Sequence, residues 1–78
     1  MTKECITFKF LKMTNTAKNE NGDAIYTIHY NKKRNTIRIT LWSSSKTIVT
    51  VHNPTADEVQ YFVYGTPTSN DVKTYFLS

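Results

Sequence analysis

The sequence contains little that could crosslink the chain, bend it sharply or carry it across a membrane. It has one cysteine, Cys5, so no internal disulfide can form and folding needs no oxidising compartment. It has two glycines and two prolines. No window approaches the roughly 20 apolar residues of a membrane helix, and the N-terminus lacks the apolar run of a signal peptide. We therefore expect a cytoplasmic protein without a membrane partner.

Patterns typical of catalysis and metal binding are also missing. His29 and His52 fall on predicted strands two positions apart, roughly 10 Å by the usual strand spacing, so one zinc ion could not join them. Cys5 has no base placed beside it and no third group to orient one, and it is better explained as a small packing residue. The carboxylates occur where loops and helix N-termini favour them. We expect no enzyme and no cofactor.

The charge that is present is mostly positive and unevenly distributed. Ten Lys and Arg residues against six Asp and Glu give a net charge of +4, which favours acidic partners. Residues 24–52 hold five basic residues and no acidic one, whereas residues 53–78 hold three acidic residues and only Lys73. With 78 residues, the chain predicts a single α+β domain over residues 1–78, with a basic sheet and a mildly acidic helical end.

Alternation of apolar and polar residues predicts four strands in an antiparallel meander. The first lies in "ECITFKFLK" and places Ile6, Phe8 and Phe10 on one face. The others span residues 25–31, 36–42 and 47–52. Residues 14–23, "TNTAKNENGD", are predicted to form a flexible segment, with a turn at Asn21-Gly22, since both residues tolerate positive φ.

Parity sets the expected register of the last three strands, because a shift of one residue would turn an apolar set to the other face. Tyr30 should pair with Ile37 and Ile28 with Ile39, leaving a four-residue loop at residues 32–35. Leu41 should pair with Val49 and Ile39 with Val51, leaving a three-residue loop at residues 44–46. The face opposite the core then carries three transverse rows: Ile25, Trp42 and Ile48; Thr27, Thr40 and Thr50; His29, Arg38 and His52.

One helix signal is strong, in "NPTADEVQYFVYGTP". Thr55 can cap this helix with Glu58 completing a capping box, and Gly65 with Pro67 ends it. Residues 69–78 fit either a short capped helix or a fifth strand, and we favour the helix. The predicted architecture is therefore a four-stranded antiparallel meander with one or two C-terminal helices packed on one face.

The sheet face away from the helices is the predicted partner-binding surface. An exposed Trp flanked by isoleucines is typical of an interface anchor, and a basic hairpin turn can neutralise phosphates. The predicted contact residues are Ile25, His29, Lys32, Lys33, Arg34, Arg38, Trp42 and Ile48. The alternative is that the N-terminal arm, the loop at residues 14–23 or the C-terminus covers Trp42.

Four predicted strands followed by a helix ending "FVYGTP", Phe62 to Pro67, resemble the small phage anti-CRISPR proteins that inhibit type I-F surveillance complexes. The resemblance covers the helix end and the strand order, and residues 1–52 share no motif with that family. It implies a small antiparallel sheet with helices on one side, bound to the backbone protein subunits so that target DNA cannot hybridise. It assigns no binding residue.

The sequence is therefore compatible with two functions of different class. The first is a phage-type inhibitor that docks on a protein or nucleoprotein complex of host defence, in the host cytoplasm, and blocks access of nucleic acid. The second is a small basic nucleic-acid-binding module that uses the sheet face and the Lys/Arg turn. Edge strands that could pair between copies leave a homodimer open as well.

Overall fold

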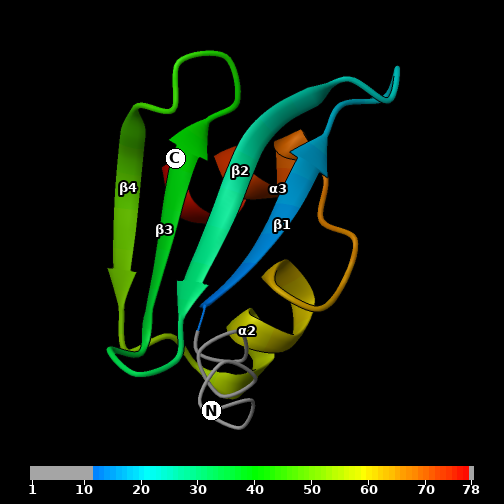
Figure 1. Ribbon diagram of the computed structural model, residues 1–78. Helices are drawn as coiled ribbons and strands as arrows, with labels where there is room; N and C mark the ends of the chain where they lie inside the picture. Colours follow the sequence, from blue (N-terminus) through cyan, green and yellow to red (C-terminus); the bar gives the residue numbers. More distant parts are fainter. Residues whose placement is uncertain (1–11, 78) are drawn as a thin grey trace, which may run out of the picture.

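The computed structural model describes residues 12–77, which form one antiparallel sheet and a short helical segment at the C-terminal end. The strands are β1 (Lys12–Lys18), β2 (Ala24–Asn31), β3 (Thr36–Leu41) and β4 (Thr47–His52). They lie in the order β1-β2-β3-β4, each antiparallel to the next (Figure 1). The predicted α+β meander is confirmed.

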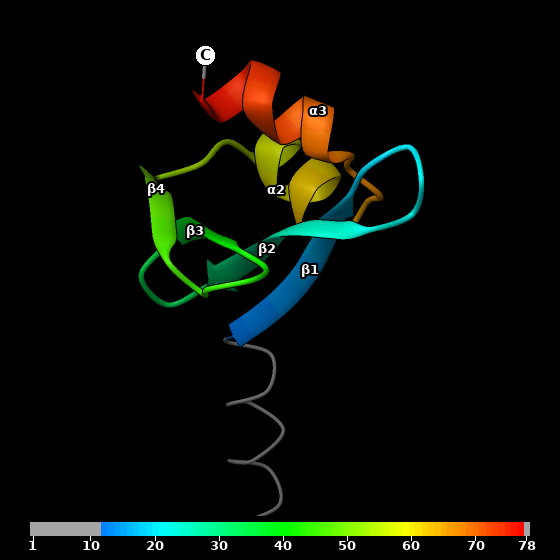
Figure 2. The same cartoon turned by 90° about the horizontal axis from the view of Figure 1, so that it is seen from above.

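The helical segment follows the sheet and packs on one of its faces. It consists of α2 (Ala56–Phe62), α3 (Ser69–Val72) and a π-helical turn, η1 (Lys73–Leu77), that continues α3. Figure 2 shows α2 and α3 on the same side of the sheet. We refer to the sheet face that points away from these helices as the outer face. The second helix, which the sequence favoured over a fifth strand, is confirmed.

Both helices begin with a complete capping box. The Thr55 hydroxyl accepts from the Glu58 N–H while the Glu58 carboxylate accepts from the Thr55 N–H, as the sequence predicts. Thr68 and Asp71 repeat this arrangement at the start of α3. Two donors at each N-terminus are thus satisfied within four residues.

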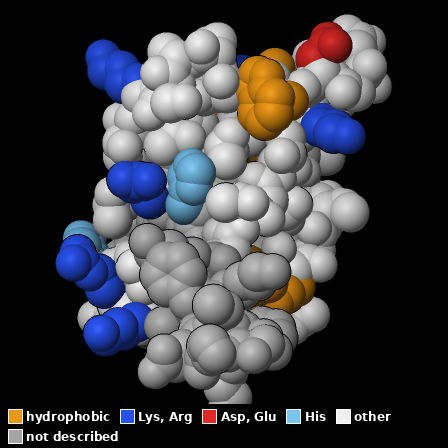
Figure 3. Space-filling model, viewed as in Figure 1, with side chains coloured by type: hydrophobic (Ala, Val, Ile, Leu, Met, Phe, Trp, Pro, Cys, Tyr) orange, Lys and Arg blue, Asp and Glu red, His pale blue; other side chains and the backbone are white. Residues whose placement is uncertain are grey.

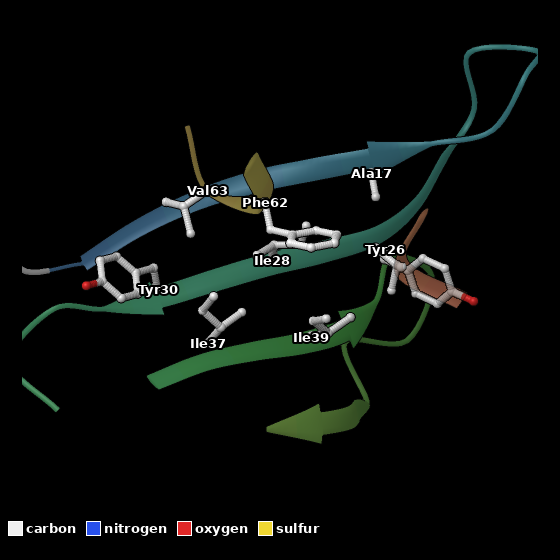
Figure 4. Close-up of a cluster of buried hydrophobic side chains, with 9 residues drawn as sticks. Ala17, Tyr26, Ile28, Tyr30, Ile37, Ile39, Phe62 and Val63 are labelled. Carbon is white, nitrogen blue, oxygen red and sulfur yellow. The ribbon is translucent and has the colours of Figure 1, made fainter. Parts of the chain in front are cut away.

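The core lies between the helices and the inner face of the sheet (Figure 4). The Phe62 ring lies against the β2 and β3 isoleucines, and Val63 lies near Tyr30. Leu41, Val49 and Val51, predicted as core, are only half-buried. The buried hydrophobic residues are Ala17, Tyr26, Ile28, Tyr30, Ile37, Ile39, Phe62, Val63 and Val72.

Strand β1 corrects the prediction of a flexible segment at residues 14–23. Lys12–Lys18 is a strand paired along its length with β2, and only the following turn, with Gly22 at φ 85°, behaves as predicted. The strand predicted around Ile6, Phe8 and Phe10 lies outside the described residues. The error arose because the inward positions of β1 include a polar residue, Asn15, which hides the alternation.

Asn15 connects β1 to the end of α2. Its Nδ2 donates to the carbonyls of Phe62 and Gly65, both at 3.0 Å, and its Oδ1 accepts from the Thr16 N–H at 2.9 Å. The last carbonyls of a helix have no partner within the helix, so a side-chain donor from the sheet satisfies them. Asn15 therefore fixes where α2 ends over the sheet.

The register of β2 with β3 is as predicted, with Tyr30 opposite Ile37 and Ile28 opposite Ile39. The register of β3 with β4 is not: Ile39 pairs with Val49 and Ile37 with Val51, two residues from the expected alignment. A bulge after Ile39 and a five-residue loop at residues 42–46 replace the predicted three-residue loop. The shift is even, so the same side chains still face inward.

Candidate functional site on the outer face of the sheet

The outer face is built by the residues that alternate with the core positions of the four strands. Across the middle of the sheet, Thr14 pairs with His29, His29 with Arg38, and Arg38 with Thr50. Directly paired side chains on one face lie about 4.5–5.5 Å apart at Cβ. This row therefore brings an imidazole and a guanidinium together between two hydroxyls.

A hollow of about 790 Å³ opens over this row toward the β2–β3 turn. Two arginines and two histidines line it, together with hydroxyl and amide side chains, and none of the described lining residues is a carboxylate. We call it the cationic hollow. Its lining residues are Met13, Thr14, His29, Tyr30, Asn31, Arg34, Thr36, Arg38, Thr50 and His52.

His29 is the partly buried group of the cationic hollow. Burial lowers the pKa of its imidazole from the ordinary 6.5, and the positive charge of Arg38 lowers it further. The His29 Nε2 lies 3.3 Å from Thr40 Oγ1, within hydrogen-bonding distance. An anion placed between His29 and Arg38 would remove the repulsion and favour the imidazolium, so the site is suited to phosphate or carboxylate groups.

The basic turn between β2 and β3 stands beside this hollow. Residues 32–35 form the predicted four-residue loop, and Lys32, Lys33 and Arg34 are all exposed. The Arg34 N–H donates to Asn31 Oδ1 at 3.1 Å, and Asn35 at the end of the loop has φ 53°. Figure 3, viewed onto the outer face, shows Lys, Arg and His side chains gathered at this end of the sheet.

The apolar end of the outer face centres on Trp42. Its side chain is 56% exposed, so the described residues do not seal it. Trp42 belongs to the β3–β4 loop rather than to β3, but its N–H donates to the Ile25 carbonyl at 3.0 Å, which keeps the two residues side by side. Ile25 is half-buried. Figure 3 shows hydrophobic side chains near this end, remote from the basic turn.

All three predicted rows are corrected by the β3–β4 register, and in the middle row Thr40 pairs with Thr47 instead of Thr50. Ile48 lies at the bulge, between the residues that face Thr40 and Ile39, and does not pair with Trp42. It remains 38% exposed. His52 pairs with Thr36 instead of Arg38, while Thr50 takes the place beside Arg38. His52 nevertheless lines the same hollow as His29 and Arg38.

The sequence missed several residues of the cationic hollow. Thr14 was missed because β1 was not recognised, and Thr36 and Thr50 because the register was shifted. Asn31 was predicted only as the end of a strand. Alternation along residues 12–18 is visible once Asn15 is accepted as an inward residue, so the signal was present but weak.

Metal chemistry receives no support from the described part of the chain. Within residues 12–77, no three His, Cys, Asp or Glu side chains come close enough to hold a metal ion. Cys5 lies outside that range. The arrangement on the outer face is suited to binding: cations and hydroxyls at one end, and an exposed indole at the other.

Comparisons with protein-family models, curated proteins and solved structures found no match to this chain. Among residues 12–77, none of the helices has both the length and the apolar character needed to cross a bilayer.

Proposed function

We propose that this protein is a non-enzymatic, phage-type inhibitor that docks through its outer face on a protein or nucleoprotein complex of host defence and blocks access of nucleic acid. It would act in the host cytoplasm and without a cofactor. The observation that carries the proposal is the joint presence, on one sheet face, of an exposed Trp42 and the cationic hollow. The resemblance to anti-CRISPR proteins, noted at residues 62–67, supplies the class of target.

An exposed indole beside aliphatic side chains favours a protein partner. Trp and Arg are the residues that most often dominate the binding energy of protein interfaces. Trp42 and Arg38 are both exposed on this face. The positive charge excludes one inhibitor strategy, the imitation of DNA, which needs acidic side chains in place of phosphates. The chain would bind acidic protein surfaces or exposed phosphates of the complex instead.

The inhibitor is tested by titration of the chain into a purified type I-F surveillance complex while the binding of target DNA is followed by fluorescence anisotropy. We expect Trp42→Ala to weaken inhibition by about 30-fold or more, the effect of losing a hot-spot residue. Tyr64→Ala is the matched control, since Tyr64 is a similarly exposed aromatic residue, at 52%, that follows α2 and is not on the outer face. A folded Trp42→Ala variant that inhibits as well as the parent would contradict docking through this residue.

The alternative function is a nucleic-acid-binding module, and the cationic hollow favours it specifically. Arginine, hydroxyl and amide groups are the side chains that usually contact phosphates, and an exposed Trp can stack on a base. For a labelled single-stranded oligonucleotide, this function predicts affinity that falls steeply with salt. Changing Lys32, Lys33 and Arg34 together to alanine should then abolish binding. Inhibition that survives this triple change would favour docking on protein.

A further inference from the structure

A second concave site lies on the opposite side of the molecule, between α2 and the α3–η1 segment. It is a groove of about 320 Å³, near the lower limit for a ligand pocket and of a size for one long side chain. Aromatic rings form most of its wall, and carboxylates stand at its rim. We call it the acidic aromatic groove. The lining residues that matter are Asp57, Glu58, Tyr61, Phe62, Asp71 and Tyr75.

The three rings come from two separate helical segments. Phe62, at 3% exposure, forms the floor, with its ring centroid 5.1 Å from that of Tyr61 and 5.4 Å from that of Tyr75. Tyr61 is 47% exposed and Tyr75 is 58% exposed, so both rings are accessible from solvent. A ligand entering the groove would meet aromatic surface on both sides.

Hydrogen bonds across the groove hold these tyrosines in place. The Tyr61 hydroxyl, on α2, donates to the Asp71 carboxylate on α3. In the opposite direction, the Tyr75 hydroxyl on η1 is hydrogen-bonded to the Glu58 carboxylate on α2, and this bond helps to raise the pKa of Tyr75. The Tyr61–Asp71 hydrogen bond thus joins α2 to α3 across the groove, and Tyr75 interacts with Glu58 from the other segment.

The carboxylates retain charge and acceptor capacity. Hydrogen bonds from Tyr61 and from the Thr68 backbone lower the pKa of Asp71, and the Thr55 backbone N–H chiefly lowers that of Glu58, so both are ionised at neutral pH. A carboxylate can accept about four hydrogen bonds, and the tyrosine and cap donors use two. Asp57 adds a third negative group, and within residues 12–77 no Lys, Arg or His lines the groove.

The aromatic walls and the negative charge of the groove together favour one class of ligand. An anion would be repelled by three carboxylates, and a purely apolar group would desolvate them without compensation. A guanidinium can stack on an aromatic face while its N–H groups donate to carboxylates, and its aliphatic stem covers the apolar floor. We propose that the acidic aromatic groove binds an arginine side chain presented by a partner protein. This site is independent of the outer face and of the function proposed for it.

The proposal is tested with two short peptides that differ only in charge. Acetyl-Gly-Arg-Gly-amide and its citrulline counterpart, which is nearly the same shape but neutral, are titrated into the ¹⁵N-labelled protein and followed by NMR. We expect the arginine peptide to shift the amide signals of Tyr61, Asp71 and Tyr75, with affinity at least tenfold above that of the citrulline peptide. Equal shifts from both peptides, or none from either, would overturn the proposal.

Variants locate the site. Tyr75→Leu should weaken arginine binding at least fivefold, whereas Tyr64→Leu, at an exposed tyrosine outside the groove, should not change it. Asp57→Asn removes rim charge without touching either capping box, so it reports on the groove if Tyr75→Leu disturbs folding. Equal binding by Asp57→Asn and by the parent would count against the groove.

A second copy of the chain is the competing occupant, since its Lys32–Arg34 turn is also basic. Sedimentation at the NMR concentration decides between the two. A monomer is the expected result. Self-association that disappears when Lys32, Lys33 and Arg34 are changed to alanine would place that turn in the groove and overturn the assignment to a partner protein.

Discussion

Replacing Asn15 by alanine removes a side chain that joins β1 to the C-terminal end of α2. Two hydrogen bonds from Nδ2 are lost, those to the carbonyls of Phe62 and Gly65, each 3.0 Å long. The bond from the Thr16 N–H to Oδ1 is lost as well. The carbonyls are then left at a helix end next to the core, where water has limited access.

The expected cost is large for a domain of this size. A net contribution of about 0.5–1.5 kcal/mol for each of the two bonds to α2 gives about 1–3 kcal/mol for Asn15→Ala. The whole domain is expected to be stable by about 4–12 kcal/mol, from the usual range per residue. Asn15→Asp should cost more, because a carboxylate would face two carbonyl oxygens at the negative end of the helix dipole.

Urea unfolding followed by circular dichroism measures this effect. Thr14→Val is the matched control, since it changes the neighbouring residue of β1 on the outer face and keeps β-branching. We expect the control to remain within about 0.5 kcal/mol of the parent. The reasoning is refuted if Asn15→Ala also remains within that limit, because the hydrogen bonds of Asn15 to α2 would then contribute nothing to the free energy of unfolding.

Two further predictions test other parts of the fold. A Cβ at Gly65 would lie 2.5 Å from the Tyr61 carbonyl oxygen, so Gly65→Ala should lower the free energy of unfolding in urea by about 1–3 kcal/mol. Gly22 has φ 85° and open space around it, so Gly22→Ala should lose about 1–2 kcal/mol from backbone strain alone. A fully stable Gly65→Ala protein would contradict the close approach. Because the pKa of His29 is lower in the folded than in the unfolded protein, the unfolded chain binds the proton more tightly, and stability should fall as pH drops from 6.5 toward the folded-state pKa. Thermal melts between about pH 5 and pH 7 should show a weaker pH dependence for His29→Gln, and an unchanged slope would show that His29 does not cause it.

The sequence predicted the parts of the fold that depend on local alternation. The strands at residues 24–52 and the capped α2 each carry their signal within a few residues, as with Thr55 and Glu58. Strand β1 was not predicted because its inward residues are Met13, Asn15 and Ala17, which are not uniformly apolar. Asn15 is tolerated there only because α2, some 50 residues later, supplies its acceptors.

The site was predictable to a similar degree. Parity alone placed His29 and Arg38 together and put Trp42 beside Ile25 on the same face. Parity could not separate two β3–β4 registers that differ by two residues, because both bury the same side chains. The observed register goes with a β3–β4 loop in which Ser45 has φ 58°. A serine in the sequence does not predict this positive φ. The acidic aromatic groove depends on how α2 and η1 pack, which neither segment encodes by itself.

Within residues 12–77, the two sides of the fold differ in charge. The sheet side carries positive charge at the Lys32–Arg34 turn, and the helical side carries negative charge at Asp57, Glu58 and Asp71. In the electric field of a polyanion, a protein with this charge distribution would turn its sheet side toward the polyanion before contact. The rate of productive encounter should therefore depend on ionic strength more than the lifetime of the bound state does.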